Sequence, residues 1–564
     1  MNFKVSLNSA DLHPEKSNLM FRGYMRHNGM LLFDGQAEAI LQDILAESSL
    51  DKLLSEINGS FQLIYYQDNV LHFTIDHFGG QALFYKLTNG TLELFDDPMT
   101  FPHGSKLNDA ALCAVLSAGY TIGAETVFQD VVECAPGTLY SFDCSTGKLD
   151  SKTWYHYYSS DESDFDPAEL ESLVQSLFPD TEQGQYTLSL SGGIDSRFLL
   201  GLLLRKETAF QTFSFGSESN FDRSLAAKLA AFFQFRHNDH RFDETLCRQY
   251  FTPEDIRFII RNCTLGRSLP NETDLISSRL LNPATDIICK GFCGDGLAGS
   301  LLNDKVLKLS SLDGITNYLF EKYFDLTPLS GRTFKNTLRA NLKTDLNRLL
   351  NKNKGSYVST TEEWHLLHKQ RKYVVNTLSF YKAAGYRFYL PFYDRRLMDF
   401  FANLKLSEKL HQKAYYNYLK EHIFTGKLAV LKEIPTSRKG FRHQVKPNLR
   451  QRITETLHHL SARYDPAKLR RRFSSLPLSL YADSFLLLTG KLQDASFLHK
   501  KVGANFPELV SVSAYLRDAG CSQASSHLVW LSRQSTAQLN LNGLALCRFF
   551  LNEQFSAMLA EHIT

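Results

Sequence analysis

The segment that most constrains the fold joins an apolar stretch to an amphipathic one through Ser191-Gly192-Gly193-Ile194-Asp195-Ser196. Tyr186 to Leu190 predicts a strand, and Ser196 to Lys206 predicts a helix. The two glycines allow a tight turn and a close approach of the backbone to a ligand. The serine hydroxyls and the free amides at the helix start form a concave anion site. The sequence therefore predicts a strand–loop–helix unit that binds phosphate groups.

Asp195 lies inside this predicted anion-binding turn. A carboxylate there would repel phosphates unless a divalent cation bridged them, so the loop implies Mg²⁺. The loop lacks both the Gly-Lys-Ser/Thr ending of a Walker A loop and the G-x-G-x-x-G dinucleotide fingerprint. Two common phosphate-binding motifs are therefore excluded for this segment.

Short apolar stretches and longer amphipathic stretches continue to alternate after this loop. Gln211 to Phe215 predicts a strand, and Asp222 to Phe233 predicts a helix with apolar residues at helical spacing. This order is typical of a parallel α/β sheet. We expect such a domain over residues 166–445.

The regions on either side have other patterns. In residues 1–165, aromatic and β-branched runs such as Phe61 to Tyr66 and Val70 to Ile75 are separated by turn residues, which predicts antiparallel sheet. Residues 446–564 have a mostly helical pattern, and we treat them as a C-terminal extension. The sequence therefore predicts three regions, which agrees with the length of 564 residues.

Composition excludes several classes of protein. The net charge of +2 argues against a dedicated nucleic-acid binder. Apolar runs such as Phe198 to Leu204 are far shorter than the ~20 residues that a membrane span needs. The nine cysteines are scattered without metal-site spacing, and Met1 to Leu7 do not begin a secretory signal. We expect a cytoplasmic protein with reduced thiols and no membrane span.

The loop and several later segments resemble the asparagine synthetase superfamily, whose members are N-type ATP pyrophosphatases. Besides the loop, the resemblance rests on Gln211 to Gly216 and on Lys290 to Gly299. It implies ATP and Mg²⁺ as cofactors. The residues that it assigns to ATP and pyrophosphate are Leu190, Ser191, Gly192, Gly193, Asp195, Ser196, Phe215, Gly216 and Gly291.

The resemblance also supplies the charged groups of the reaction. Asp295 falls on the second Mg²⁺-ligating aspartate of the family, beside Asp195. Pro435 to Phe441 resembles the loop with the catalytic lysine that touches the phosphates, and either Lys439 or Arg438 is the equivalent cation. A cation there would stabilise charge that grows on the phosphates in the transition state.

A further block, Leu390 to Asp394, resembles the R-x-P-F-L-D segment near the acceptor pocket. It implies substrate-pocket roles for Arg387, Tyr389 and Asp394. The family's glutamate and arginine upstream of this block are Arg387 and Tyr389 here, and Gly296 replaces the glutamate after Asp295. These departures leave the identity of the acid open.

The N-terminal region resembles the family's glutaminase-like domain at Gly59-Ser60-Phe61, at Asp76 to Tyr85 and at Ala135-Pro136-Gly137. Glutamine-hydrolysing members use a cysteine at position 2 as nucleophile. The sequence given begins Met1-Asn2, and its first cysteine is Cys113. We therefore expect no glutamine hydrolysis by that mechanism, as in β-lactam synthetases and lasso-peptide cyclases.

Ser60, Asp76 and His77 could also be combined into a hydrolytic triad. Nothing in the sequence indicates their geometry, and surface turns explain them better. We expect no triad there.

The expected fold class is mixed α/β and α+β. An N-terminal Ntn-hydrolase-like antiparallel β-rich domain, residues 1–165, precedes a parallel α/β ATP-pyrophosphatase domain, residues 166–445, and a helical extension, residues 446–564. The resemblance implies an adenine nucleotide α-hydrolase-like topology for the second domain.

The expected function is that of an ATP-dependent carbon–nitrogen ligase that releases AMP and pyrophosphate. It would adenylate a small-molecule or peptide carboxylate and couple it to an amine or ammonia. One alternative is a lasso-peptide-type macrolactam cyclase with a precursor peptide or partner protein, and another is a non-catalytic nucleotide-binding or scaffold protein. No nucleic-acid partner is expected, and the oligomeric state is open, with a dimer as one option.

Overall fold

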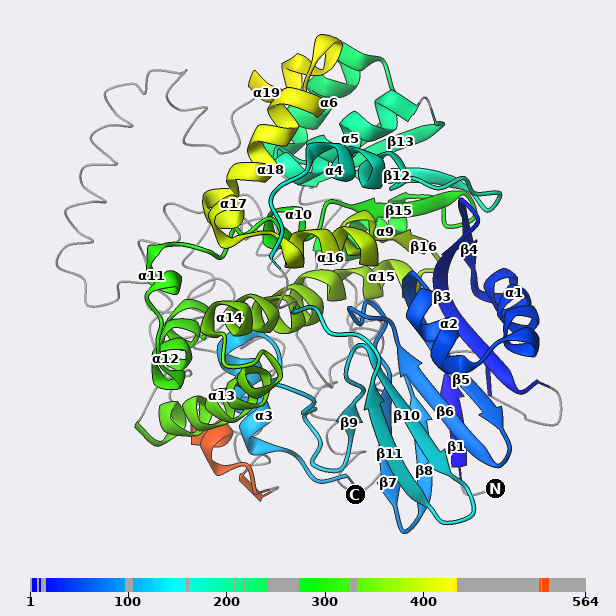
Figure 1. Ribbon diagram of the computed structural model, residues 1–564, viewed down its shortest axis with the longest axis vertical. Coiled ribbons are helices and arrows are strands. Elements are labelled where there is room, and N and C mark those ends of the chain that lie inside the picture. Colours follow the sequence, from blue (N-terminus) through cyan, green and yellow to red (C-terminus); the bar gives the residue numbers. More distant parts are fainter. Residues whose placement is uncertain are drawn as a thin grey trace, which may run out of the picture.

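The protein is described by a computed structural model, in which two antiparallel-rich β-sheets and one parallel sheet are joined by helices (Figure 1). This mixed architecture confirms the expected α/β and α+β fold class. The structure describes residues 3–7, 10–11, 17–96, 105–158, 162–206, 208–216, 220–241, 273–324, 332–433, 517–518 and 520–526. Of the predicted C-terminal extension, 446–564, almost all lies outside these residues.

The N-terminal region contains two sheets that face each other. The first has the order β2 (Ala10–Asp11), β1 (Phe3–Leu7), β8 (Thr91–Phe95), β7 (Phe84–Thr88) and β9 (Val132–Glu133). The second has the order β11 (Lys148–Thr153), β10 (Thr138–Asp143), β6 (Val70–Ile75), β5 (Gly59–Gln67), β3 (Leu19–His27) and β4 (Met30–Phe33). All pairings are antiparallel except that of β1 with β8.

Strand β5 is the central strand of this region because both of its faces are covered. Ile64 packs into the core shared with the first sheet, whereas Phe61 and Leu63 pack beneath two helices, α1 (Asp34–Glu47) and α2 (Leu50–Glu56). The alternation follows from the two-residue period of a strand. The predicted antiparallel sheet over the first residues is therefore confirmed.

The parallel sheet has the order β14 (His237–Arg241), β13 (Phe210–Gly216), β12 (Gln185–Ser189), β15 (Asp286–Lys290) and β16 (Arg387–Tyr389). The chain runs from β12 through β13 to β14 on one side and then returns to β15 on the other side of β12. The direction of strand order thus reverses at β12. In open α/β sheets, ligands bind at the carboxyl ends of the strands at such a switch point.

Helices surround the parallel sheet and share one large core with it (Figure 1). Helix α6 packs on β13 and β14, and α15 packs on β16. These helices are α4 (Pro167–Gln175), α5 (Ile194–Lys206), α6 (Phe221–Phe233), α9 (Thr273–Leu280), α10 (Gly294–Leu297), α15 (Leu378–Ala383), α16 (Arg395–Asn403), α17 (Leu406–Lys409), α18 (Lys413–Tyr418) and α19 (Val430–Glu433), with the short turns η4 (Pro391–Tyr393), η5 (Leu410–Gln412), η6 (Leu419–Ile423) and η7 (Gly426–Ala429).

A second helical group packs against α3 (Asp109–Ala118), which belongs to the N-terminal region. It consists of α11 (Asp304–Leu307), α12 (Leu312–Tyr323), α13 (Arg332–Lys352) and α14 (Tyr357–His365). Helix α14 continues into a π-helix, η2 (Leu366–Val374), and a 3₁₀ turn, η3 (Val375–Thr377). None of the helices in the described residues is both long and apolar enough to span a bilayer.

Buried ion pairs connect the N-terminal sheets to the π-helix. The two carboxylate oxygens of Glu133 lie 2.8 Å from the Arg371 guanidinium and 2.9 Å from the Lys372 ammonium. All three side chains are almost fully buried. Removing one partner from such a cluster leaves an uncompensated buried charge, which costs about 3–5 kcal/mol. The contacts therefore tie the N-terminal region to the segment that leads toward the parallel sheet.

Candidate active site

The predicted anion-binding loop connects β12 to α5, at the carboxyl end of β12. Its own hydroxyls shape it, because the Ser196 Oγ lies 3.0 Å from the Ser191 carbonyl oxygen and 3.1 Å from that of Gly193. The Ser191 Oγ accepts the N–H of Gly193 at 3.1 Å. A carboxylate from α6, Asp222, accepts the N–H of Gly192 at 2.8 Å. Local hydrogen bonds thus hold the loop in one conformation.

Two carboxylates meet where this loop faces α10. Asp195 Oδ2 accepts the backbone N–H of Asp295 at 2.9 Å, and Asp195 Oδ1 accepts the hydroxyl of Tyr415 at 2.8 Å. Burial and then the nearby Asp295 carboxylate raise the pKa of Asp195 to about 7. Burial also raises the pKa of Asp295. The raised pKa values indicate that the neighbouring residues stabilise two negative charges at this pair only poorly.

Glycines allow the segment after β15 to lie against the loop. A Cβ atom on Gly291 would lie 2.8 Å from the Ser196 amide nitrogen. One on Gly294 would lie 2.7 Å from the Phe392 ring and 2.8 Å from the Asp195 carboxyl carbon. Such distances are well below ordinary carbon contacts. Only glycine fits at both positions without a shift of the loop.

These elements enclose a cavity of about 590 Å³ at the switch point of the parallel sheet. Its volume is within the usual range of about 300–1,000 Å³ for small-molecule sites. Eight of the predicted residues line it: Leu190, Ser191, Gly193, Asp195, Ser196, Phe215, Gly291 and Asp295. Gly192 and Gly216 are buried behind this surface.

The charges on the cavity wall are unbalanced. Among its described lining residues there are four carboxylates, Asp195, Asp222, Asp274 and Asp295, and one cation, Lys290. An anion would meet repulsion from such a wall. A polyphosphate could therefore bind there only together with further positive charge.

Sequence reasoning missed Lys290 and Asp274. Lys290 ends β15, is 5% exposed and pairs with Asp274, which also accepts the Tyr381 hydroxyl at 2.9 Å. The ammonium lies 5.0 Å from the Tyr381 ring centre and 5.1 Å from that of Phe292. Burial lowers the pKa of Lys290, and Asp274 partly offsets this. The signal that could have identified Lys290 is its position, because it is a charged residue at the end of an apolar strand.

The three predicted substrate-pocket residues do not line this cavity. Tyr389 is buried, and its hydroxyl donates to the carbonyl of Leu177. Asp394 caps α16 by accepting the Arg396 N–H at 3.0 Å, and it pairs with Arg26 of β3. Arg387 donates to the Gln183 carbonyl at 2.8 Å and lines a different cavity. These polar groups attach β16 and the segment that follows it to neighbouring elements.

The predicted phosphate-contacting cations, Arg438 and Lys439, lie outside the described residues. Their assignment therefore stays a prediction.

The possible triad in the N-terminal region has another arrangement. Ser60 Oγ lies 3.2 Å from Asp76, but His77 Nε2 bonds the Tyr393 carbonyl at 2.9 Å. All three side chains are buried, so the interpretation as surface turns was wrong. They are buried because Asp76 organises the turn between the sheets and His77 faces the α/β domain.

The fold and the cavity define a class of α/β protein with a hydroxyl-rich anion loop and an acidic wall at the carboxyl edge of a parallel sheet. A family model described as asparagine synthase matches residues 181–478. The chain therefore belongs to the asparagine synthase family, which typically comprises ATP-dependent amide-forming ligases. No curated protein matches the chain significantly.

Proposed function

We propose that the protein is an amide ligase that releases AMP and pyrophosphate. A substrate carboxylate attacks the α-phosphorus of ATP, the bond to the bridging oxygen breaks, and pyrophosphate leaves. An amine or ammonia then attacks the acyl-adenylate and displaces AMP, losing a proton. The observation that carries the proposal is the hydroxyl-rich loop facing two carboxylates in one cavity of about 590 Å³.

The loop would take the pyrophosphate half of the nucleotide. Ser191, Gly193 and Ser196 line the cavity. The Gly193 N–H and the Ser196 hydroxyl already donate within the loop, and the Ser191 hydroxyl is placed to donate to a phosphate oxygen. Phe215, at the end of β13, supplies an aromatic wall suited to the adenine. Gly216 has a φ of 145° and packs on Asn220, which caps α6. Its role is therefore to position this end of the strand.

The donor set fits Mg²⁺, because Asp195 and Asp295 present carboxylate oxygens on one wall. When bound, Mg²⁺ neutralises phosphate charge and polarises the phosphoryl group under attack. The chain's own part is to keep both aspartates in place, through the Tyr415 hydroxyl and the backbone of α10.

A second source of positive charge would come from Arg438 or Lys439, because the described wall has one cation against four carboxylates. Either side chain would stabilise charge on the leaving pyrophosphate. We assign this role to the pair and leave the choice between them to mutagenesis.

The nitrogen donor would be a free amine or ammonia rather than glutamine hydrolysed by this chain. In the described N-terminal region, Cys113 and Cys134 are fully buried and Cys144 is partly exposed, and burial raises the pKa of all three thiols. A cysteine nucleophile needs the opposite, a lowered pKa and an accessible thiol. Cys113 and Cys134 are therefore core residues.

ATP–pyrophosphate exchange tests the proposal. Purified full-length protein is incubated with MgATP, labelled pyrophosphate and panels of amino acids, sugar acids and short peptides. We expect exchange that depends on one class of acid, is lost in Asp195→Asn and persists in Asp43→Asn, a matched change at an exposed residue. Absence of MgATP binding to the wild type by calorimetry would reject the ligase and favour a scaffold.

A further inference from the structure

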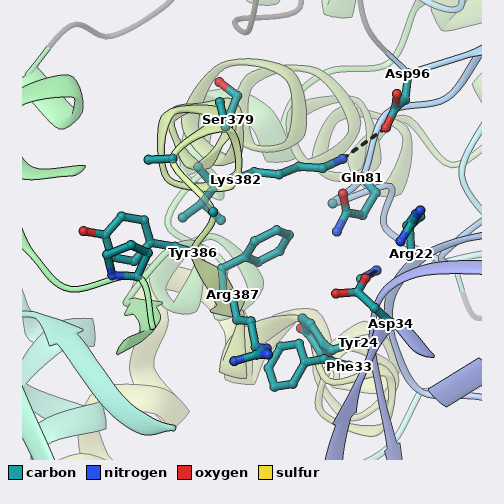
Figure 2. A pocket seen from close by; sticks show the side chains of 18 of the residues that line it. Arg22, Tyr24, Phe33, Asp34, Gln81, Asp96, Ser379, Lys382, Tyr386 and Arg387 are labelled. Atoms are coloured by element: carbon teal, nitrogen blue, oxygen red, sulfur yellow. Dashed lines mark hydrogen bonds and ion pairs between the residues drawn. The ribbon is translucent and has the colours of Figure 1, made fainter. Parts of the chain in front are cut away.

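A second and larger cavity, of about 780 Å³, lies between the N-terminal sheets and the α/β domain. Figure 2 shows Arg22 and Asp34 on its N-terminal side, and Lys382, Tyr386 and Arg387 on the opposite side. Aromatic rings of Phe33, Tyr386 and Phe388 form part of the wall. The cavity therefore combines an apolar surface with cations from three elements, β3, α15 and β16, an arrangement typical of small-molecule sites.

The charge of this wall is opposite to that of the first cavity, which lies at the switch point of the parallel sheet and which we call the nucleotide cavity. Its described lining includes three cations, Arg22, Lys382 and Arg387, and two carboxylates, Asp34 and Asp96. Both carboxylates already have partners within the protein. Asp34 Oδ1 accepts the Gly23 N–H at 2.9 Å, and Asp96 pairs with Lys382 at 3.4 Å (Figure 2).

The cations keep unused donors. The Nε of Arg22 is buried and has no hydrogen-bond partner among the described residues. Arg387 donates one hydrogen bond, to the Gln183 carbonyl, and its guanidinium lies 5.7 Å from the centre of the Phe33 ring. Guanidinium groups match carboxylate and phosphate oxygens in particular.

We propose that this cavity is a second ligand site, which takes a small molecule with an aromatic or apolar body and one carboxylate or phosphate group. The anion contacts Arg22 and Arg387, and the apolar body lies against Phe33, Tyr386 and Phe388. The ligand is small, because the cavity volume is that of a site for one metabolite.

The site is separate from the nucleotide cavity but shares one wall with it. Tyr373, Val374 and Thr377 line the nucleotide cavity, whereas Val375 and Asn376 line the second one. The π-helix and the 3₁₀ turn η3 thus expose successive residues to opposite sides. Irregular helical turns of this kind occur often at functional sites.

The test uses two matched aromatic anions, benzoate and phenyl phosphate, with neutral benzamide as a control. Each is titrated into the full-length protein by calorimetry at a fixed ionic strength. We expect saturable binding of at least one anion and none of benzamide. Arg22→Gln and Arg387→Gln should each weaken it by about tenfold or more, because a charge-assisted contact is lost. Arg236→Gln, the same change at an exposed arginine, should leave it unchanged.

The two anions distinguish a carboxylate ligand from a phosphate ligand. The proposal is overturned if neither anion binds the wild type, if benzamide binds equally well, or if both cavity variants bind as tightly as the wild type. Melting curves without ligand show whether each variant is folded. A variant that has unfolded is replaced by Arg22→Lys or Arg387→Lys, which keep the charge but lose the paired donors.

Discussion

Two buried aspartates, each beside a pair of glycines, have different roles. In the N-terminal region, Asp76 accepts backbone N–H groups from Phe61, Phe78, Gly79 and Gly80, at distances from 2.6 to 3.3 Å. In the α/β domain, Asp195 accepts the backbone N–H of Asp295 and the hydroxyl of Tyr415. It also lines a cavity that a second carboxylate shares.

The difference shows how the surroundings of a carboxylate separate a structural role from a chemical one. Burial raises the pKa of both groups. At Asp76, four backbone amides partly offset this, and the charge is satisfied inside the protein. At Asp195, the next largest cause after burial is another carboxylate, so the residues around Asp195 stabilise its charge less well. The presence of two nearby glycines in the sequence does not by itself distinguish an aspartate like Asp76 from one like Asp195.

The largest expected effect is on activity at Asp195. Replacing it by Asn removes charge that would hold the cation while keeping the size of the side chain. We expect ATP–pyrophosphate exchange to fall by about a thousandfold, or about 4 kcal/mol in the barrier. The free energy of unfolding, measured in urea, should change by less than about 1 kcal/mol. A large loss of stability with little loss of exchange would show that Asp195 has a structural role, like Asp76.

At Asp76 we expect the opposite result. In Asp76→Asn, an NH₂ group replaces one of two oxygens that accept backbone N–H groups, so buried donors are left unpaired. The unfolding free energy should fall by about 2–4 kcal/mol. Folded protein should still bind MgATP with wild-type affinity in calorimetry. Wild-type stability of this variant would show that the turn does not depend on the carboxylate.

A third prediction concerns the close packing around Asp195. Gly294→Ala places a Cβ atom against the Asp195 carboxyl and the Phe392 ring. We expect a loss of about 1–3 kcal/mol in unfolding free energy, because extra atoms strain a packed site. Exchange should fall as well, since the two aspartates move apart.

Gly35→Ala is the matched control for this change. Gly35 lies in α1, where a new Cβ atom meets nothing within 4 Å. This variant should be equally or more stable than the wild type, because alanine favours helix by about 1 kcal/mol. Equal effects of the two substitutions would contradict the role of close packing.

A gradual effect, a pH dependence of stability, is expected from His77, next to Asp76. Burial, and then the charge of Arg395, lower the pKa of His77 to about 3 in the folded protein, against an ordinary value of 6.5. Between these two pH values the unfolded chain binds a proton that the folded protein does not. The unfolding free energy should therefore fall as the pH is lowered below 6.5, by up to about 1.4 kcal/mol per pH unit.

His77→Gln isolates this contribution from those of other buried histidines such as His365, whose pKa is also lowered to about 3. Urea unfolding at several pH values between 6.5 and 4.5 should give a shallower slope for the variant. Identical slopes would show that His77 can be protonated without unfolding.

Much of the architecture could be predicted from residue patterns. The expected strand Gln211 to Phe215 is observed as Phe210–Gly216, and the expected helix Asp222 to Phe233 as Phe221–Phe233. The loop from Ser191 to Ser196 was recognisable because its glycines, hydroxyls and aspartate are adjacent in the chain. Local spacing carries this information, since a strand, a tight turn and a helix start are all formed by consecutive residues.

The remaining features depend on contacts between distant parts of the chain. Lys290 meets Asp274 and Tyr381 only after the chain returns to β15 beside β12. Arg387 and Asp394 follow one another closely in the sequence, yet Arg387 faces the second cavity and Asp394 pairs with Arg26 of the N-terminal region.

The sequence by itself therefore determined the strand–loop–helix unit with its adjacent glycines, hydroxyls and aspartate, and it indicated the family. The tertiary structure alone decided which carboxylates share a wall and which polar residues are structural. It also brought cations from three elements around a second cavity. The physical reason is that burial and the charge of neighbours set the role of an ionisable side chain, and both arise from residues that are far apart in the chain.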